Sequence, residues 1–185
     1  MHSAVWTYAL EALALVVAVW AGWIDWHSRR IPNWLTVPAL LTGIAVSTLG
    51  GGWTGTKASL EGAGLGLGLL LPFVLLRGLG AGDWKLMGAM GAFLGWAGLV
   101  VVLLGTVFIA GLMAVVQVIR SRRIKETLRN LWVLLLAMVT FGIRGQRENI
   151  TLDNPGLMTL PFGVATAMAT IMLVGTLSVL RILQL

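Results

Sequence analysis

The chain has 185 residues, of which 58% are hydrophobic and only 11% are charged, with a mean hydropathy of +0.92. Soluble domains carry about a quarter charged residues, so this composition excludes a soluble globular fold, a disordered chain and a disulfide-stapled secreted domain. The net charge of +6 is interpreted as a mark of membrane topology rather than of nucleic-acid binding, because no basic helix is separable from a membrane flank. The sequence therefore indicates a membrane protein.

The scarcity of cysteine and histidine limits the possible chemistry. There is no cysteine, which excludes disulfides, thiolate catalysis and cysteine-based metal centres, and the two histidines are too few for a histidine-rich metal site. No Lys or Arg precedes Arg29, whereas a cleaved signal peptide begins with a positive region. We therefore expect the first helix to be retained, with its N-terminal end outside.

Apolar runs predict the helices in chain order. A crossing needs about 20 mostly apolar residues. Candidate spans cover residues 4–24, 34–50, 60–76 and 159–180, and the run 86–119 is long enough for two more, with a turn at Gly95-Trp96-Ala97-Gly98. The sequence thus predicts an all-α bundle of six transmembrane helices, which forms one membrane-embedded domain over residues 1–185.

The segment 124–143 has a charged first half and an apolar second half that is short for a crossing. We interpret it as an amphipathic helix along the inner interface, with a seventh span as the alternative. In the six-span topology every Lys and Arg except Lys57 and Arg181 lies on the inner side, which is the positive-inside pattern. A seven-span topology would weaken that bias.

Glycines are spaced for close helix packing. Gly62, Gly64, Gly66 and Gly68 form overlapping small-xxx-small pairs, and Gly91 with Gly95 forms another. Such spacing lets helix backbones approach closely in lipid. We expect the third and fourth spans to pack tightly against each other.

Two acidic residues lie at matching helix ends. Asp25 closes the first span and Asp83 opens the fourth. Between them the chain crosses outward once and returns once, so both carboxyl groups are expected at the same, cytoplasmic, end of the bundle. Two carboxyl groups held close share one proton, which suits acid–base hydrolysis of a peptide bond. The alternative is that each carboxylate is only a helix cap or an interfacial ion-pair partner.

The flanking residues favour a functional role. Gly80 and Gly82 are expected to adopt conformations closed to other residues and to allow close approach by a substrate strand. Pro32 is expected to keep the segment that leaves Asp25 extended.

These residues carry a family resemblance. Asp25 followed by Ile31-Pro32-Asn33, together with Gly80-x-Gly82-Asp83-x-Lys85, resembles the type IV prepilin peptidase family of membrane aspartyl proteases. Leu160-Pro161-Phe162-Gly163, at the start of the last span, is similar to a Pro-aromatic-Gly turn of that family. The resemblance implies that Asp25 and Asp83 form a catalytic dyad that activates water.

The resemblance also implies the substrate and the supporting residues. The family cleaves the short basic leader of pilin-like precursors just after a glycine, at the cytoplasmic face of the inner membrane. Lys85 would steady the Asp83 loop, meet the substrate or act only as a basic anchor, and Asn33 is expected to cap the second helix. No metal or organic cofactor is implied.

The chain looks like the short form of the family, closest to the peptidases that serve Tad/Flp-type pili. Larger members carry a cytoplasmic region with paired Cys-x-x-Cys motifs and also N-methylate the new terminus. The absence of cysteine and the short loop after the first span lead us to expect no methyl transfer.

A rival interpretation is a non-enzymatic membrane component, such as a small proton or cation transporter or a pilus-assembly scaffold. A transporter favours ionisable groups near the midplane and internal repeats, whereas here the two key carboxylates lie at one edge and no convincing repeat is found. Glu11 lies inside the first span, where an unpaired charge is costly, and has no assigned role. Glu126, Glu148 and Asp153 are expected to pair with neighbouring basic residues. His27 is expected to be exposed, with tuning of its neighbour Asp25 as the alternative.

Overall fold

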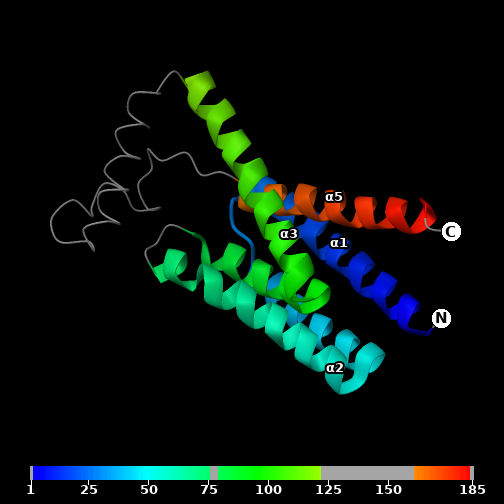
Figure 1. Cartoon of the computed structure of the whole chain (residues 1–185). Helices are drawn as coiled ribbons and strands as arrows, with labels where there is room; N and C mark the ends of the chain where they lie inside the picture. Colours follow the sequence, from blue (N-terminus) through cyan, green and yellow to red (C-terminus); the bar gives the residue numbers. More distant parts are fainter. Residues whose placement is uncertain (1, 76–78, 122–160, 184–185) are drawn as a thin grey trace. The chain divides into compact units, whose positions relative to one another are not determined.

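The computed structural model describes residues 2–75, 79–121 and 161–183. These residues form four α-helices, α1 (His2–Ser28), α2 (Asn33–Leu75), α3 (Ala81–Ser121) and α5 (Phe162–Leu183), with no strand among them (Figure 1). Each helix is long and apolar enough to cross a membrane. The described part of the chain therefore confirms an all-α, multi-pass membrane fold, whereas the count of six crossings stays a prediction.

The predicted interfacial helix at 124–143 lies outside the described residues, as do Glu126, Glu148 and Asp153. By their contacts, residues group into two compact units, Met1–Ile109 with Pro161–Leu185 and Ala110–Leu160. The contacts and cavities described below all lie within the first unit.

Two of the helices are broken by a single glycine. In α2, Gly52 has φ 56° and ψ −139°, and in α3, Gly95 has φ 67° and ψ −177°. Glycine reaches these angles at little cost because it has no Cβ. The break at Gly95 falls where the sequence predicted a turn. Residues 51–59 were expected to form a loop between two spans, but the backbone is helical on both sides of Gly52.

The two parts of α2 contact the same turn of α3. Ser47, before the break, and Ser59, after it, both donate hydrogen bonds to the carbonyl oxygen of Ala92, at 3.3 and 2.8 Å. Near the break, the hydroxyls of Thr48 and Thr56 lie 2.9 Å apart. The parts of α2 therefore lie side by side and meet at the cyan turn in Figure 1.

Glycines bring the second part of α2 against α3. A Cβ on Gly62 would meet the carbonyl of Gly91, and a Cβ on Gly66 would lie 2.7 Å from the carbonyl oxygen of Met87. This confirms the predicted close packing of these segments. The prediction was wrong for Gly64 and Gly68, which have nothing within 4 Å of such a Cβ. Positions two residues apart lie on opposite sides of a helix, so only alternate glycines of the series reach the interface.

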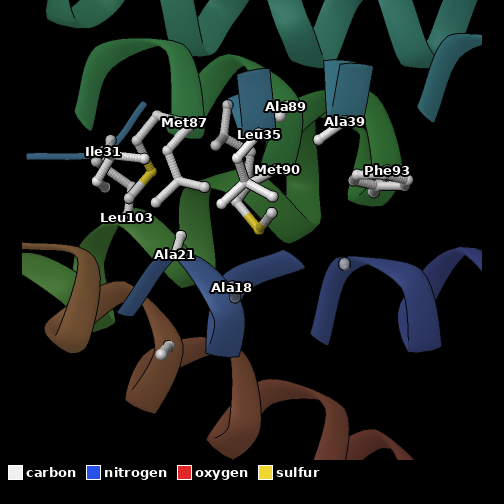
Figure 2. Packing of buried hydrophobic residues seen from close by; sticks show 14 of the residues in the cluster. Ala18, Ala21, Ile31, Leu35, Ala39, Met87, Ala89, Met90, Phe93 and Leu103 are labelled. Atoms are coloured by element: carbon white, nitrogen blue, oxygen red, sulfur yellow. The ribbon is translucent and has the colours of Figure 1, made fainter. Parts of the chain in front are cut away.

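The buried core lies between the same elements. Figure 2 shows Leu35 and Ala39 of α2 beside Met87 and Met90 of α3, with Ala18 of α1 on the other side. On α1 the buried apolar side chains are all alanine, so its backbone comes close to its neighbours α2 and α5. Large apolar side chains are mostly exposed on the outer surface, as expected where the surrounding solvent is lipid.

Candidate active site

The end of α1 places Asp25 in the interior. Its side chain is 5% exposed. Arg29 adopts a left-handed conformation (φ 54°) and donates its backbone N–H to the carbonyl of Asp25 at 2.9 Å, which ends the helix in the manner of an αL cap. The helix thus stops one turn after the carboxylate.

A short segment then joins α1 to α2. The carbonyl of Pro32 accepts the backbone N–H groups of Leu35 and Thr36, at 3.2 and 3.4 Å. Pro32 rather than Asn33 therefore holds the N-cap position of α2, and the expectation that Asn33 caps this helix was wrong. Asn33 is the first residue of α2, and its side chain accepts a hydrogen bond from Lys85 instead.

Asp83 lies in the first turn of α3. The carbonyl of Gly80 accepts the N–H of Trp84 at 3.2 Å, so Gly80 is the N-cap residue. The Asp83 carboxylate turns back over Gly80, where a Cβ would lie 2.8 Å from Oδ2. Glycine at the N-cap therefore leaves room for the carboxylate.

The glycines of this turn act by their small size rather than by unusual backbone angles. Among the described residues, positive φ at glycine occurs only at Gly52 and Gly95, so the conformational role expected for Gly80 and Gly82 was wrong. A Cβ on Gly82 would lie 2.5 Å from the carbonyl oxygen of Ile31. The close approach at Gly82 is thus made by the segment that follows Asp25.

Lys85 and Asn33 connect the two acidic segments. The Nζ of Lys85 donates a hydrogen bond of 2.9 Å to Oδ1 of Asn33. Together with the contact of Gly82 and Ile31, this hydrogen bond ties the start of α3 to the start of α2. The role of Lys85 in the Asp83 turn or toward substrate stays a prediction.

The start of α5 supplies a partner for Asp25. The backbone N–H of Gly163 donates a hydrogen bond of 2.8 Å to Oδ2 of Asp25. A Cβ on Gly163 would lie 2.9 Å from the Cβ of Asp25. The sequence marked Pro161-Phe162-Gly163 as a turn, but nothing in it indicated that this turn contacts Asp25.

Asp25 and Asp83 line one cavity of about 550 Å³. Its other lining residues come from the end of α1, the segment 29–32, the first residue of α2 (Asn33) and the Gly80 turn. The two carboxyl groups thus share one cavity although they come from different helices. Such a pair, one member of it buried, has the groups needed to hold a water molecule and exchange protons with it. The described residues contain no cluster of three or more metal-ligating side chains.

Two other titratable groups, His27 and Glu11, are not among the residues that line this cavity. His27 is exposed, as expected, and its Nδ1 donates to the carbonyl of Trp23 at 2.9 Å. Glu11 pairs with Arg181 of α5 through two hydrogen bonds, of 2.6 and 2.7 Å. This pair was missed because the sequence does not indicate that α1 and α5 are neighbours.

Comparison with known proteins agrees with the resemblance noted in the sequence. The profile of the type IV leader peptidase family matches residues 12–115, a range that contains both Asp25 and Asp83. The prepilin leader peptidase/N-methyltransferase of Burkholderia pseudomallei (strain K96243) is 40% identical over 103 residues, which cover 49% of this chain and 32% of that protein. Its namesake from Aeromonas hydrophila is 36% identical over 114 residues, which cover 57% and 39%.

A third relative, from Aeromonas salmonicida (strain A449), bears the same name and is 38% identical over 116 residues, covering 56% of this chain and 40% of that protein. The match thus spans less than half the length of these curated relatives. No solved structure matches the chain. Because the family profile covers more than half of its residues, the chain belongs to the type IV leader peptidase family.

Proposed function

We propose that this protein is a membrane aspartyl endopeptidase that removes the short basic leader peptide from type IV pilin-like precursors. Cleavage follows a glycine at the cytoplasmic face of the inner membrane, and Asp25 and Asp83 activate the attacking water. The observation that carries the proposal is the single cavity that both carboxyl groups line, although they come from different helices. The family of the chain and the names of its relatives support the substrate class.

The reaction requires one carboxylate and one carboxylic acid. Two acidic groups that share a cavity do not both ionise cheaply, so the pair retains one proton. The carboxylate takes a proton from water as the water oxygen bonds to the peptide carbonyl carbon, and the carboxylic acid protonates the carbonyl oxygen. When the C–N bond breaks, the first group protonates the leaving nitrogen and the second recovers a proton from a hydroxyl. The pair returns to its starting state.

Basic residues near the cavity support its proposed placement at the cytoplasmic face of the membrane. Arg29 and Arg30 follow Asp25, and Lys85 follows Asp83, which is the basic pattern of an inner membrane face. The apolar helices beside the cavity would hold the hydrophobic helix of the precursor while its leader reaches the carboxyl groups. Residues 29–32 join α1 and α2 directly, and the chain has no cysteine, so the proposal covers leader cleavage and not methyl transfer.

The test is leader removal by detergent-purified protein, followed by mass spectrometry of a pilin-like precursor. Asp25→Asn and Asp83→Asn are each expected to lower the cleavage rate by about 10²–10⁴-fold or more, as for loss of an acid–base group. Glu61→Gln, an exposed acidic position on α2, is the matched control and keeps the parental rate. Parental cleavage by either Asn variant would refute the dyad. If the parent removes no leader but conducts protons or cations in vesicles, the transporter interpretation replaces the proposal.

A further inference from the structure

The ion pair of Glu11, which is buried, and Arg181, which is 31% exposed, is not used by the proposed reaction. Both oxygens of Glu11 accept hydrogen bonds from the Arg181 guanidinium, and the Glu11 side chain is 9% exposed. The guanidinium also lies 4.8 Å from the ring centroid of Tyr8. A carboxylate inside a membrane helix bundle is costly to desolvate, so the presence of Glu11 and its partner calls for a physical reason.

Few large side chains interlock between α1 and α5. The residues that α5 buries are all small: Gly163, Ala165, Thr166, Ala167, Ala169 and Thr170. Of these, Gly163 and Ala167 lie against Gly22 of α1. Ala169 lies against Gly105 of α3. On α1, Ala14, Ala18 and Gly22 form a matching stripe of buried small residues at helical spacing. Small side chains permit close approach, but they interdigitate little and therefore oppose sliding of one helix along the other only weakly.

The second half of α5 is held even less by packing. None of residues 171–180 is buried. A cavity of about 310 Å³ lies there, lined by Leu10 and Glu11 of α1, Phe93 and Leu94 of α3, and Leu173 and Leu177 of α5. The apolar contacts of this half thus leave the axial position of α5 weakly determined.

Polar contacts mark both ends of this helix pair. Gly163 bonds Asp25 at one end, and Arg181 bonds Glu11 at the other. At 1.5 Å per residue, Asp25 lies about 21 Å from Glu11 along α1, and Gly163 lies about 27 Å from Arg181 along α5. Helical side chains tilt toward the N-terminus of their own helix. Because α1 and α5 run antiparallel, this tilt moves the Glu11 carboxylate and the Arg181 guanidinium toward each other. The tilt thereby makes up for the difference between the two lengths along the helices.

We propose that the Glu11–Arg181 pair fixes the axial register of α5 on α1 and so holds the backbone amide of Gly163 against Asp25. A one-turn slip of α5 would move Gly163 by about 5.4 Å, beyond hydrogen-bonding reach of the carboxylate. A buried ion pair that sets register at some cost in stability is the best-attested use of such pairs. Glu11 and Arg181 are therefore positioning residues, remote from the cavity that contains Asp25 and Asp83.

The test separates register from stability. In the variant Glu11→Leu with Arg181→Leu, apolar side chains replace the pair, which leaves stability about the same or higher. Because the chain has no cysteine, spin labels can be attached to cysteines introduced at the exposed positions Val19 and Met172. The parent is expected to give one narrow distance between the labels, whereas the double-leucine variant gives a broadened or shifted distribution.

The consequence for cleavage rests on the proposed function. In the double-leucine variant kcat is expected to fall by about 100-fold, as for a small misplacement of a catalytic group, with KM little changed. Val16→Leu with Val179→Leu, at exposed positions of the same helices, is the matched control and should alter neither measurement. The exchanged pair, Glu11→Arg with Arg181→Glu, should restore both the narrow distance and the rate.

Three results would overturn the inference: an unchanged label distance in the double-leucine variant, an unchanged kcat despite a changed distance, or no recovery in a well-inserted exchanged variant. If the parent protein cleaves no precursor, the proposed function fails, and the label distances still decide whether the pair sets the register.

Discussion

The backbone amide of Gly163 donates a hydrogen bond of 2.8 Å to Oδ2 of Asp25, although 138 positions separate the two residues in the sequence. The first N–H groups of a helix have no partner within that helix, so a carboxylate from α1 satisfies one that belongs to α5. The positive end of the α5 dipole also faces this carboxylate. The geometry at Asp25 therefore depends on where α5 begins and how closely it approaches.

Adding a methyl group at this contact should impair cleavage. In Gly163→Ala the new Cβ would lie 2.9 Å from the Cβ of Asp25 and 3.0 Å from Cδ1 of Ile31, so one of the segments must shift. Because small displacements of catalytic groups are costly, we expect kcat to fall by about 100-fold. The matched control is Gly175→Ala on the same helix, where nothing lies within 4 Å of the added atom. Equal rates for the two variants would contradict this reading of the contact.

The approach of the two acidic segments was predictable from the sequence. Charged residues are rare in the chain, and the number of apolar runs between Asp25 and Asp83 places both at one end of the bundle. The partners of these residues were not predictable in the same way. The bond between Gly163 and Asp25 and the pair of Glu11 with Arg181 both require that α1 and α5 be neighbours, which hydrophobic periodicity does not specify.

The glycines illustrate the same limit. Their spacing predicted a close contact between the second part of α2 and α3, but not which face of α2 makes it. The sequence predicts that Gly80 and Gly82 supply unusual backbone angles. In the structure neither has a positive φ, and a side chain at either position would instead collide with Asp83 or Ile31. The sequence shows where the glycines are, but only the residues packed against each glycine show whether a larger side chain would fit there.

We expect Lys85 and Asn33 to support cleavage through the hydrogen bond between their side chains. Loss of their hydrogen bond, which is exposed, in Lys85→Met or Asn33→Leu should cost about 0.5–1 kcal/mol and should loosen the Asp83 turn. We expect cleavage to fall by a similar factor in each variant and by little more in the double variant, which a double-mutant cycle measures. Asn33→Asp keeps an acceptor for the ammonium group and should retain activity. Additive losses would show that the residues act independently.

The glycines on the two sides of the second part of α2 should respond differently to substitution by alanine. In Gly62→Ala the added Cβ meets the Gly91 carbonyl, so α2 and α3 must separate, and we expect a loss of about 1–3 kcal/mol. In Gly64→Ala the added atom enters open space, and the higher helix propensity of alanine should stabilise the protein by up to about 1 kcal/mol. Thermal unfolding in detergent measures both changes. A Tm that falls as far for Gly64→Ala as for Gly62→Ala would contradict this assignment of faces.

The break in α3 depends on backbone angles rather than on space. At Gly95, φ is 67° and ψ is −177°, and the nearest atom to an added Cβ, the carbonyl oxygen of Ala58, is 4.0 Å away. These angles lie in a region that is essentially restricted to glycine, so Gly95→Ala should cost about 1–3 kcal/mol although there is room for its methyl group. Asparagine tolerates the left-handed helical region, where ψ is near +47°, but not this one. Gly95→Asn should therefore destabilise the protein as much as Gly95→Ala, whereas Gly175→Ala should not. Recovery of Tm in the Asn variant would show that α3 bends at Gly95 through an ordinary left-handed turn.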